Sequence, residues 1–319
     1  MGLLKNKTKY KRLNCKLIDN SKSDYHINRC FKSPHFKLFY NGKYIYFKTQ
    51  PSIELCYNEL ICNEIAKQMK INCVEYNLAE LTHNKVCYKG LISDNFINKN
   101  QSYIECAAFS FRDNDGLCGV LRNLDDYKLQ KIYNFDRDEI ELDLFKMIIF
   151  DFITCQSDRH DWNFGFIVEN SNNGIPTIKV APLFDNEQSF GSNCKRDLTD
   201  MWSIINLNLR FTPYNYNRLN IECIMGGESY ETAREIIYYA KNKPHLLEYV
   251  KSILREFDTQ NLHTNLQKKN VVIPKKKLDM VCNIIREKKS ELFRAYIDLL
   301  TPQKVKAQKI NNKDNSQSK

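Results

Sequence analysis

Two short stretches of the sequence carry side chains whose types and spacing suit phosphoryl transfer. The first is S-D-R-H-D-W-N-F-G-F (residues 157–166), in which Asp158 precedes Asn163 by five positions. The second is A-P-L-F-D-N-E (residues 181–187), which contains Asp185. Transfer of a phosphoryl group from ATP needs an acid beside the attacking hydroxyl, oxygen ligands for a divalent metal, and a cation on the phosphates. Asp158 suits the first role, whereas Asn163 and Asp185 are oxygen ligands that suit Mg²⁺ or Mn²⁺.

The D-x-x-x-x-N spacing is common by itself, so its surroundings decide its meaning. It follows an apolar-patterned helix predicted over residues 138–155 and precedes a strand predicted over 164–168. A Ser-Asn-Asn-Gly turn and a second predicted strand, 177–184, then place Asp185 at the end of a strand. The alternative is that Asp158 only caps a loop and Asp185 only shapes a turn. Their joint arrangement favours the phosphoryl-transfer interpretation over that alternative.

The first 95 residues are predicted to form strands around one helix. Two apolar alternating segments flank Asn41-Gly42, a pair that accepts the positive φ angles of a type I′ hairpin turn. A helix pattern follows over residues 53–69, and two further alternating segments, 73–81 and 85–92, predict a second hairpin.

The later part of the chain has mainly helical patterns, over about 229–241, 245–257 and 276–299. The sequence therefore predicts an α+β, two-lobed fold: a small β-rich N-lobe (residues 1–95) and a larger helical C-lobe (residues 96–301), with a cleft between them. Residues 302–319 are rich in Lys, Asn, Gln and Ser, a composition that predicts a disordered basic tail.

The N-lobe is expected to supply the cation for the phosphates. Lys48 ends the second strand of the predicted hairpin, and Glu59 lies within the following helix, where it can hold the ammonium group as an ion pair. Residues of these types at a strand end and on a helix are usually just solvated. Together with the acid pattern, they are predicted to bind ATP.

The loop before the hairpin, N-R-C-F-K-S-P-H-F-K at 28–37, contains no glycine, so a G-x-G-x-x-G loop is absent there. An ordinary basic surface loop is the alternative reading. Three of its residues are candidates for phosphate contacts: Lys32, Ser33 and Lys37. Adenine is expected to lie against residues 90–95, around Ile92, and to pair with backbone groups.

The motifs resemble those of a known family. D-R-H-x-x-N followed by L-F-D resembles the catalytic and metal-binding segments of HipA-like serine/threonine protein kinases, and these enzymes also lack the glycine fingerprint. The resemblance implies that Asp158 is the catalytic base, that Asn163 and Asp185 bind the metal, and that Arg159 and His160 organise the loop.

The same resemblance implies an ATP- and Mg²⁺-dependent (or Mn²⁺-dependent) transferase that phosphorylates Ser or Thr on proteins, itself included. Ser33 is the candidate autophosphorylation site, because its loop should cover the γ-phosphate. The resemblance also implies a soluble protein of the bacterial cytoplasm, with delivery into host cells as an effector as a further expectation. The motif D-R-H-x-x-N also occurs in phosphoinositide-3/4-kinase-like enzymes, so a lipid or small-molecule kinase is the first alternative. A non-catalytic nucleotide-binding or DNA-associated module is the second.

The net charge of +10 suggests a nucleic-acid binder until its location is considered. Residues 1–16 carry six Lys or Arg and no acid, and residues 303–319 carry five Lys and one Asp, so the body between them is neutral. Direct nucleic-acid binding is therefore not expected. Neither a signal peptide nor a membrane-inserting segment is expected, and the scattered cysteines fit a reducing compartment. P-K-K-K at 274–277 is either a solvated helix start or a short nuclear-localisation signal.

Overall fold

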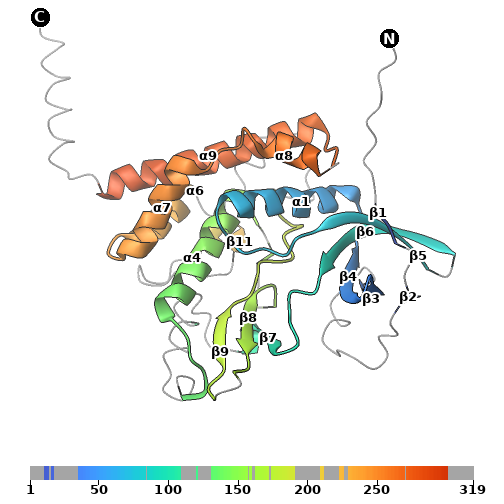
Figure 1. The fold of residues 1–319 in the computed structure, drawn as a ribbon. Coiled ribbons are helices and arrows are strands. Elements are labelled where there is room, and N and C mark those ends of the chain that lie inside the picture. Colours follow the sequence, from blue (N-terminus) through green and yellow to red (C-terminus); the bar gives the residue numbers. More distant parts are fainter. Residues whose placement is uncertain are drawn as a thin grey trace, which may run out of the picture.

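The structure is a computed structural model, and it describes the greater part of the chain between Lys11 and Leu300. The described residues are 11–13, 16–17, 35–83, 85–108, 120, 131–156, 158–159, 162–171, 174–190, 209–211, 223–225, 229–269 and 271–300. Figure 1 shows an α+β architecture in which a β-rich lobe adjoins a larger lobe that contains the C-terminal helices, as the sequence predicted. The predicted tail, 302–319, lies outside the described residues.

The β-rich lobe is built on a six-stranded sheet. Its strands are ordered β1-β5-β6-β4-β3-β2, and every neighbouring pair is antiparallel except β1 and β5. The strands are β1 (Lys11–Leu13), β2 (Lys16–Leu17), β3 (His35–Tyr40), β4 (Lys43–Thr49), β5 (Asn77–His83) and β6 (Val86–Asp94). The two hairpins predicted from the sequence are therefore present, and β1 and β2 extend the sheet at its edges.

Two backbone features fix the central strands. Asn41 and Gly42 have φ angles of 49° and 81°, which gives the hairpin between β3 and β4 the turn conformation that Asn-Gly accepts. Gly90 of β6 lies so close to β4 that a Cβ atom there would be 2.1 Å from the carbonyl oxygen of Lys48. A glycine at this position therefore allows β6 to pair closely with the strand that carries Lys48.

Helix α1 (Ile53–Gln68) is buried along most of its length. Its residues 56–66 are all buried, although the sequence pattern predicted one apolar face. Figure 1 shows the reason: α1 runs between the sheet and the helices α8 (Leu262–Lys268) and α9 (Lys275–Leu300). Polar residues of α1 consequently lie inside the protein and need partners there.

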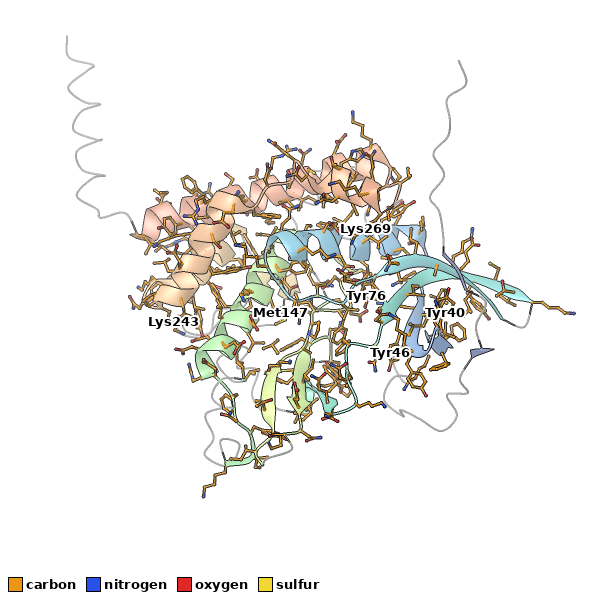
Figure 2. All side chains as sticks on the ribbon, viewed as in Figure 1. Tyr40, Tyr46, Tyr76, Met147, Lys243 and Lys269 are labelled. Atoms are coloured by element: carbon orange, nitrogen blue, oxygen red, sulfur yellow. The ribbon has the colours of Figure 1, made fainter. Side chains whose placement is uncertain are left out.

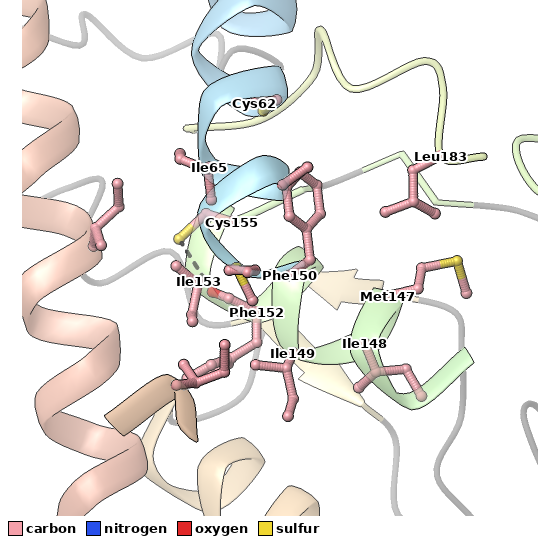
Figure 3. Close-up of a cluster of buried hydrophobic side chains, with 14 of the residues drawn as sticks. Cys62, Ile65, Met147, Ile148, Ile149, Phe150, Phe152, Ile153, Cys155 and Leu183 are labelled. Carbon is pink, nitrogen blue, oxygen red and sulfur yellow. Dashed lines mark hydrogen bonds between the residues drawn. The ribbon is translucent and has the colours of Figure 1, made fainter. Parts of the chain in front are cut away.

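Helix α4 (Arg137–Thr154) forms the centre of the main hydrophobic core. The Asp136 side chain caps its first turn by accepting hydrogen bonds from the backbone N–H groups of Asp138 (2.9 Å) and Glu139 (3.2 Å). The C-terminal half of α4 is buried, and Figure 3 shows its apolar side chains gathered with Ile65 of α1 and with Leu183: Met147, Ile148, Ile149, Phe150, Phe152 and Ile153. The core thus joins α1, α4 and the segment that leads to Asp185.

A small antiparallel sheet, with one strand before α4 in the chain and two after it, supports the second acid-bearing segment. It consists of β7 (Gln101–Glu105), β8 (Gly165–Glu169) and β9 (Thr177–Val180), and a short 3₁₀ helix, η2 (Cys106–Ala108), follows β7. The strand predicted over 177–184 is shorter than expected, because β9 ends at Val180 and Pro182 has no N–H group for a ladder. Leu183 instead bridges to Cys73, just after α1.

The C-terminal part is helical, as predicted. Its elements are β10 (Leu209–Phe211), β11 (Cys223–Met225), α6 (Ser229–Ala240), α7 (Pro244–Glu256), α8 and α9. The short helix α8 was not predicted. In the described part of the chain no helix combines the length and the apolar character needed to cross a bilayer.

The P-K-K-K segment forms the start of α9. Lys275 and Lys276 are exposed there, whereas the Lys277 side chain is only 13% exposed and pairs with Glu54 of α1 at 3.3 Å. Lys277 therefore helps to hold α9 against α1. That structural role needs no transport signal to explain it.

Candidate functional site

Lys48 lies at the centre of a cluster of carboxylates contributed by both lobes. Its Nζ is 3.4 Å from Oε1 of Glu59 on α1, and it makes shorter ion pairs with Asp185 and Glu187. The Lys48 side chain is 11% exposed and that of Glu59 is fully buried. The two residues predicted to form an ion pair are thus in contact, and Asp185 joins them across the junction of the lobes.

The strand register places Lys48 in this position. Lys48 pairs with Leu91 of β6, and Leu91 belongs to the main core under α1. Because side chains alternate along a strand, Phe47 and its partner Ile92 point to the other face, where they belong to a separate small cluster. Lys48 therefore faces α1 and the C-terminal lobe.

The charges of the cluster shift its protonation equilibria. Burial by itself lowers the pKa of Lys48, but Asp185, Glu187 and Glu59 together raise it well above its ordinary value, so the ammonium group stays charged. Burial raises the pKa of Glu187 to about 9, against the opposing effect of Lys48. One ammonium group does not balance three neighbouring carboxylates in this partly buried place.

Arg159 connects the loop after α4 to the segment that carries Asp185. Its side chain is fully buried, and the guanidinium forms a bidentate pair with Asp151 of α4, with both N–O distances at 3.0 Å. Nη1 donates to the backbone carbonyl oxygens of Asn163 (2.9 Å) and Phe184 (2.9 Å). Nη2 also donates to Oδ1 of Asn186 at 2.6 Å. Arg159 thus contacts α4, the loop and the acid-bearing segment at once, and its role as a loop-organising residue stays a prediction.

A second set of hydrogen bonds links Asp158, Asn163 and Asp185. Asn163 Nδ2 donates to the carbonyl oxygen of Asp158 at 2.7 Å, which closes the D-x-x-x-x-N loop. The Asp158 N–H donates to Oε1 of Gln156 at 3.2 Å, and Gln156 Nε2 donates to the carbonyl oxygen of Asp185 at 3.0 Å. Because its amide nitrogen is used in the loop, Asn163 would offer its amide oxygen to a cation.

Asp185 has a backbone conformation that favours few residue types. Its φ angle is 62°, in the left-handed region that Asp and Asn adopt more readily than other non-glycine residues. The preceding Phe184 stacks on Phe96 (ring centroids 6.1 Å apart) and meets Tyr103 edge-on (5.9 Å). These contacts join the segment after β6 to the residue beside Asp185.

The other residues predicted for ATP binding have varied placements. The Ile92 side chain lies on the sheet face opposite to Lys48 and therefore does not contact the carboxylate cluster. Lys37 pairs in register with Tyr46 on the face that carries Lys48, and its ammonium lies 5.2 Å from the centroid of the Tyr44 ring. Lys32, Ser33 and His160 lie outside the described residues.

Four residues of this arrangement were not singled out from the sequence: Asp151, Gln156, Asn186 and Glu187. Asp151 precedes Arg159 by eight positions, and only the end of α4 at Cys155, with a φ angle of 51°, turns the chain back so that they meet. Glu187 follows Asp185 by two positions and was visible in the motif A-P-L-F-D-N-E. This second carboxylate, two positions after the first, was the signal by which the sequence could have indicated Glu187 as a site residue.

The donor set suits a hard divalent cation. Ligand oxygens of Glu59, Asp185 and Glu187 all lie within 4.8 Å of one another. Oε2 of Glu59 is buried and has no hydrogen-bond partner among the described residues. Clustered carboxylates with an unsatisfied buried oxygen fit Mg²⁺ or Mn²⁺ rather than a soft metal.

Comparison with known proteins supports the fold but does not establish which reaction the site carries out. No family model and no curated protein matches the sequence. The structure is similar to that of the Helicobacter pylori proinflammatory kinase CtkA, with a TM-score of 0.64 and 15% identity over 91% of this chain and 98% of CtkA. Shewanella oneidensis HipA, solved with HipB and operator DNA, aligns with a TM-score of 0.48 and 13% identity over 88% of this chain and 67% of HipA. At this identity the likeness to CtkA shows the fold, which is that of a HipA-like kinase.

Proposed function

We propose that this chain, whose fold is that of HipA-like kinases, transfers the γ-phosphoryl group of ATP to Ser or Thr hydroxyls of proteins. The observation that carries the proposal is the meeting of Lys48 and Glu59 from the β-rich lobe with Asp185 from the C-terminal lobe. Phosphoryl transfer depends mainly on positioning and on neutralisation of phosphate charge, and these residue types suit both tasks.

Each residue has a defined part in this proposal. Lys48 binds the α/β-phosphates, and Glu59 holds its ammonium group in place. Asp158 accepts the proton of the attacking hydroxyl as the new O–P bond forms and the bond to the ADP oxygen breaks. Asn163 and Asp185 would hold a divalent metal, which supplies charge neutralisation on the phosphates when it is bound.

Labelled ATP and Mg²⁺ provide the direct test. The protein would be incubated with generic protein acceptors, with phosphoinositide vesicles, and alone. We expect label on Ser or Thr of protein, and its loss in Asp158→Asn and Asp185→Asn, which change charge but hardly change shape. Asn accepts the left-handed backbone of residue 185, so both variants should keep the wild-type circular dichroism spectrum and melting temperature.

The outcomes separate this proposal from its alternatives. Label on lipid without label on protein would indicate a phosphoinositide-type kinase. Full activity in either Asn variant would remove that residue from the site. Autophosphorylation is part of the proposal, with Ser33 as the acceptor, and mass spectrometry of the labelled protein would show whether this serine carries phosphate.

A further inference from the structure

Glu187 has no part in the proposed transfer reaction, in which Asn163 and Asp185 would hold the metal. It lies two residues after Asp185, its side chain is 14% exposed, and it forms an ion pair with Lys48. The Lys48 ammonium lies closer to Asp185 and Glu187 than to Glu59. A lysine that is to bind phosphates must move away from at least one of these two acids.

The position of Glu187 is set by α1. Asn58, which is fully buried and adjacent to Glu59, donates from Nδ2 to the carbonyl oxygens of Glu187 (2.7 Å) and Ser189 (3.0 Å). Asn58 and Glu59 are adjacent on α1, so this one buried helix both carries Glu59 and fixes the backbone at Glu187. Glu187 is held beside Asp185 by the fold rather than by its ion pair alone.

Charge in the cluster points to a missing cation. Three carboxyl groups face one ammonium group, which leaves a net charge of −2 when all are ionised and of −1 when Glu187, whose pKa is raised by burial, is protonated. ATP would add further negative charge. A separate observation points to a cation as well. Oε2 of Glu59 is buried and has no hydrogen-bond partner in the described part of the chain, so it also requires a compensating group.

We propose, on the basis of the function proposed above, that Glu187 is part of the divalent-cation site together with Asp185. In this arrangement Glu187 exchanges Lys48 for the cation when nucleotide binds, and Lys48 is released to the phosphates. The D-x-E spacing at 185–187 thus gives this chain an extra carboxylate for its cation. It also makes nucleotide binding strongly dependent on the metal.

Binding of Mn²⁺ to the full-length protein tests this without any need for turnover. Free Mn²⁺ would be followed by electron paramagnetic resonance in the presence and absence of a non-hydrolysable ATP analogue. Glu187→Gln should weaken Mn²⁺ binding by about tenfold or more, as removal of a carboxylate near a metal commonly does. The same variant should bind the analogue more tightly than wild type when no metal is present, because the side chain at position 187 then no longer holds Lys48 away from the phosphates.

Matched variants make the result interpretable. Glu169→Gln alters an exposed glutamate of β8 and should leave Mn²⁺ binding unchanged, whereas Asp185→Asn should weaken it. Glu187→Asp keeps the charge and should retain more of the affinity than Glu187→Gln. Circular dichroism would establish that each variant is folded.

Each outcome bears on one proposal or the other. Normal Mn²⁺ binding by Glu187→Gln, with loss in Asp185→Asn, would overturn the role of Glu187 and leave the kinase proposal intact. Tighter analogue binding without any change in Mn²⁺ affinity would also overturn it, since Glu187 would then only restrain Lys48. Weaker Mn²⁺ binding in both variants, in a protein that transfers no phosphate, would support the cation site and contradict the proposed function. A wild-type protein that binds no Mn²⁺ even with the analogue would overturn both.

Discussion

Arg159 shows how one side chain can hold separate segments of a site in register. It binds α4 through Asp151, the loop through the carbonyl of Asn163, and the acid-bearing segment through Phe184 and Asn186. Burial raises the pKa of Asp151, and the guanidinium opposes that shift. Removal of the arginine would leave a carboxylate in the interior without its counter-charge.

Replacement of Arg159 by Met should therefore destabilise the protein by roughly 3–5 kcal/mol, the usual cost of breaking a buried ion pair. Activity should fall as well, since Asn163 and Phe184 lose the donor that positions them. Urea unfolding monitored by fluorescence measures the first effect, and a kinase assay measures the second.

Two further variants control for this prediction. Arg286→Met alters an exposed arginine of α9 and should change stability by no more than about 0.5 kcal/mol. Adding Asp151→Leu to Arg159→Met should restore part of the lost stability, because the unpaired charge is removed. Strict additivity of the two changes would argue against the ion pair.

At the scale of elements, a buried glutamate ties α4 to α6 and the start of α7. Glu141 is 2% exposed, accepts a hydrogen bond from the Tyr239 hydroxyl, and pairs with Lys243 at 2.5 Å. Arg137 (3.5 Å) and the ring of His245 (3.9 Å) also face it. Asp138, Glu141 and His245 offer potential metal-ligand atoms within 4.8 Å of one another, but Lys243 already supplies a cation there.

Glu141 should make stability depend on pH. Burial by itself raises its pKa, but the hydrogen bonds from Lys243 and Tyr239 outweigh burial and hold the pKa below its ordinary value of 4.5. Its contribution is therefore fully present above pH 4.5 and is lost as the pH falls through the lower, folded-state pKa. Glu141→Gln should cost roughly 1.5–3 kcal/mol at pH 7 and progressively less below pH 4.5.

Urea unfolding of wild type and variant at a series of pH values measures this difference. Glu139→Gln, which changes an exposed glutamate of the same helix, serves as the matched control and should show little effect at any pH. A deficit in Glu141→Gln that stayed constant down to acid pH would mean that the charge of Glu141 does not stabilise the fold.

At the scale of the whole molecule, the site draws on both lobes. Lys48 belongs to the sheet and Glu59 to α1, whereas Asn163 and Asp185 follow α4. Figure 2 shows Tyr76, which follows α1, near the middle of the protein, between Tyr46 of β4 and Met147 of α4. A nucleotide with its metal would therefore connect the two lobes through the centre of the molecule.

ATP with Mg²⁺ should raise the melting temperature, because a ligand that binds only the folded state stabilises it by mass action. At a concentration of 100 times Kd the gain is about 2.7 kcal/mol. ATP with EDTA should give a smaller shift, and Lys48→Ala should reduce both shifts. Thermal unfolding followed by a fluorescent dye would measure them, and equal shifts with Mg²⁺ and with EDTA would contradict a metal-linked site.

Much of the fold could be predicted from the sequence, because it depends on local patterns. Asn41-Gly42 specifies its turn through the positive φ angles that these residues accept, and the period of apolar residues specifies α1, α4 and α9. The spacing of Asp158, Asn163 and Asp185 predicted a phosphoryl-transfer site by chemistry and by resemblance. All of these signals lie within short segments.

The tertiary structure decided what depends on contacts between distant segments. Residues 56–66 of α1 are buried on every side because helices and sheet cover it from different parts of the chain, which no periodicity in α1 reveals. The pairing of Arg159 with Asp151 requires the turn at the end of α4. Glu187 reaches Lys48 across 139 positions of sequence, so its share in the site follows from the fold of both lobes and not from its own neighbours.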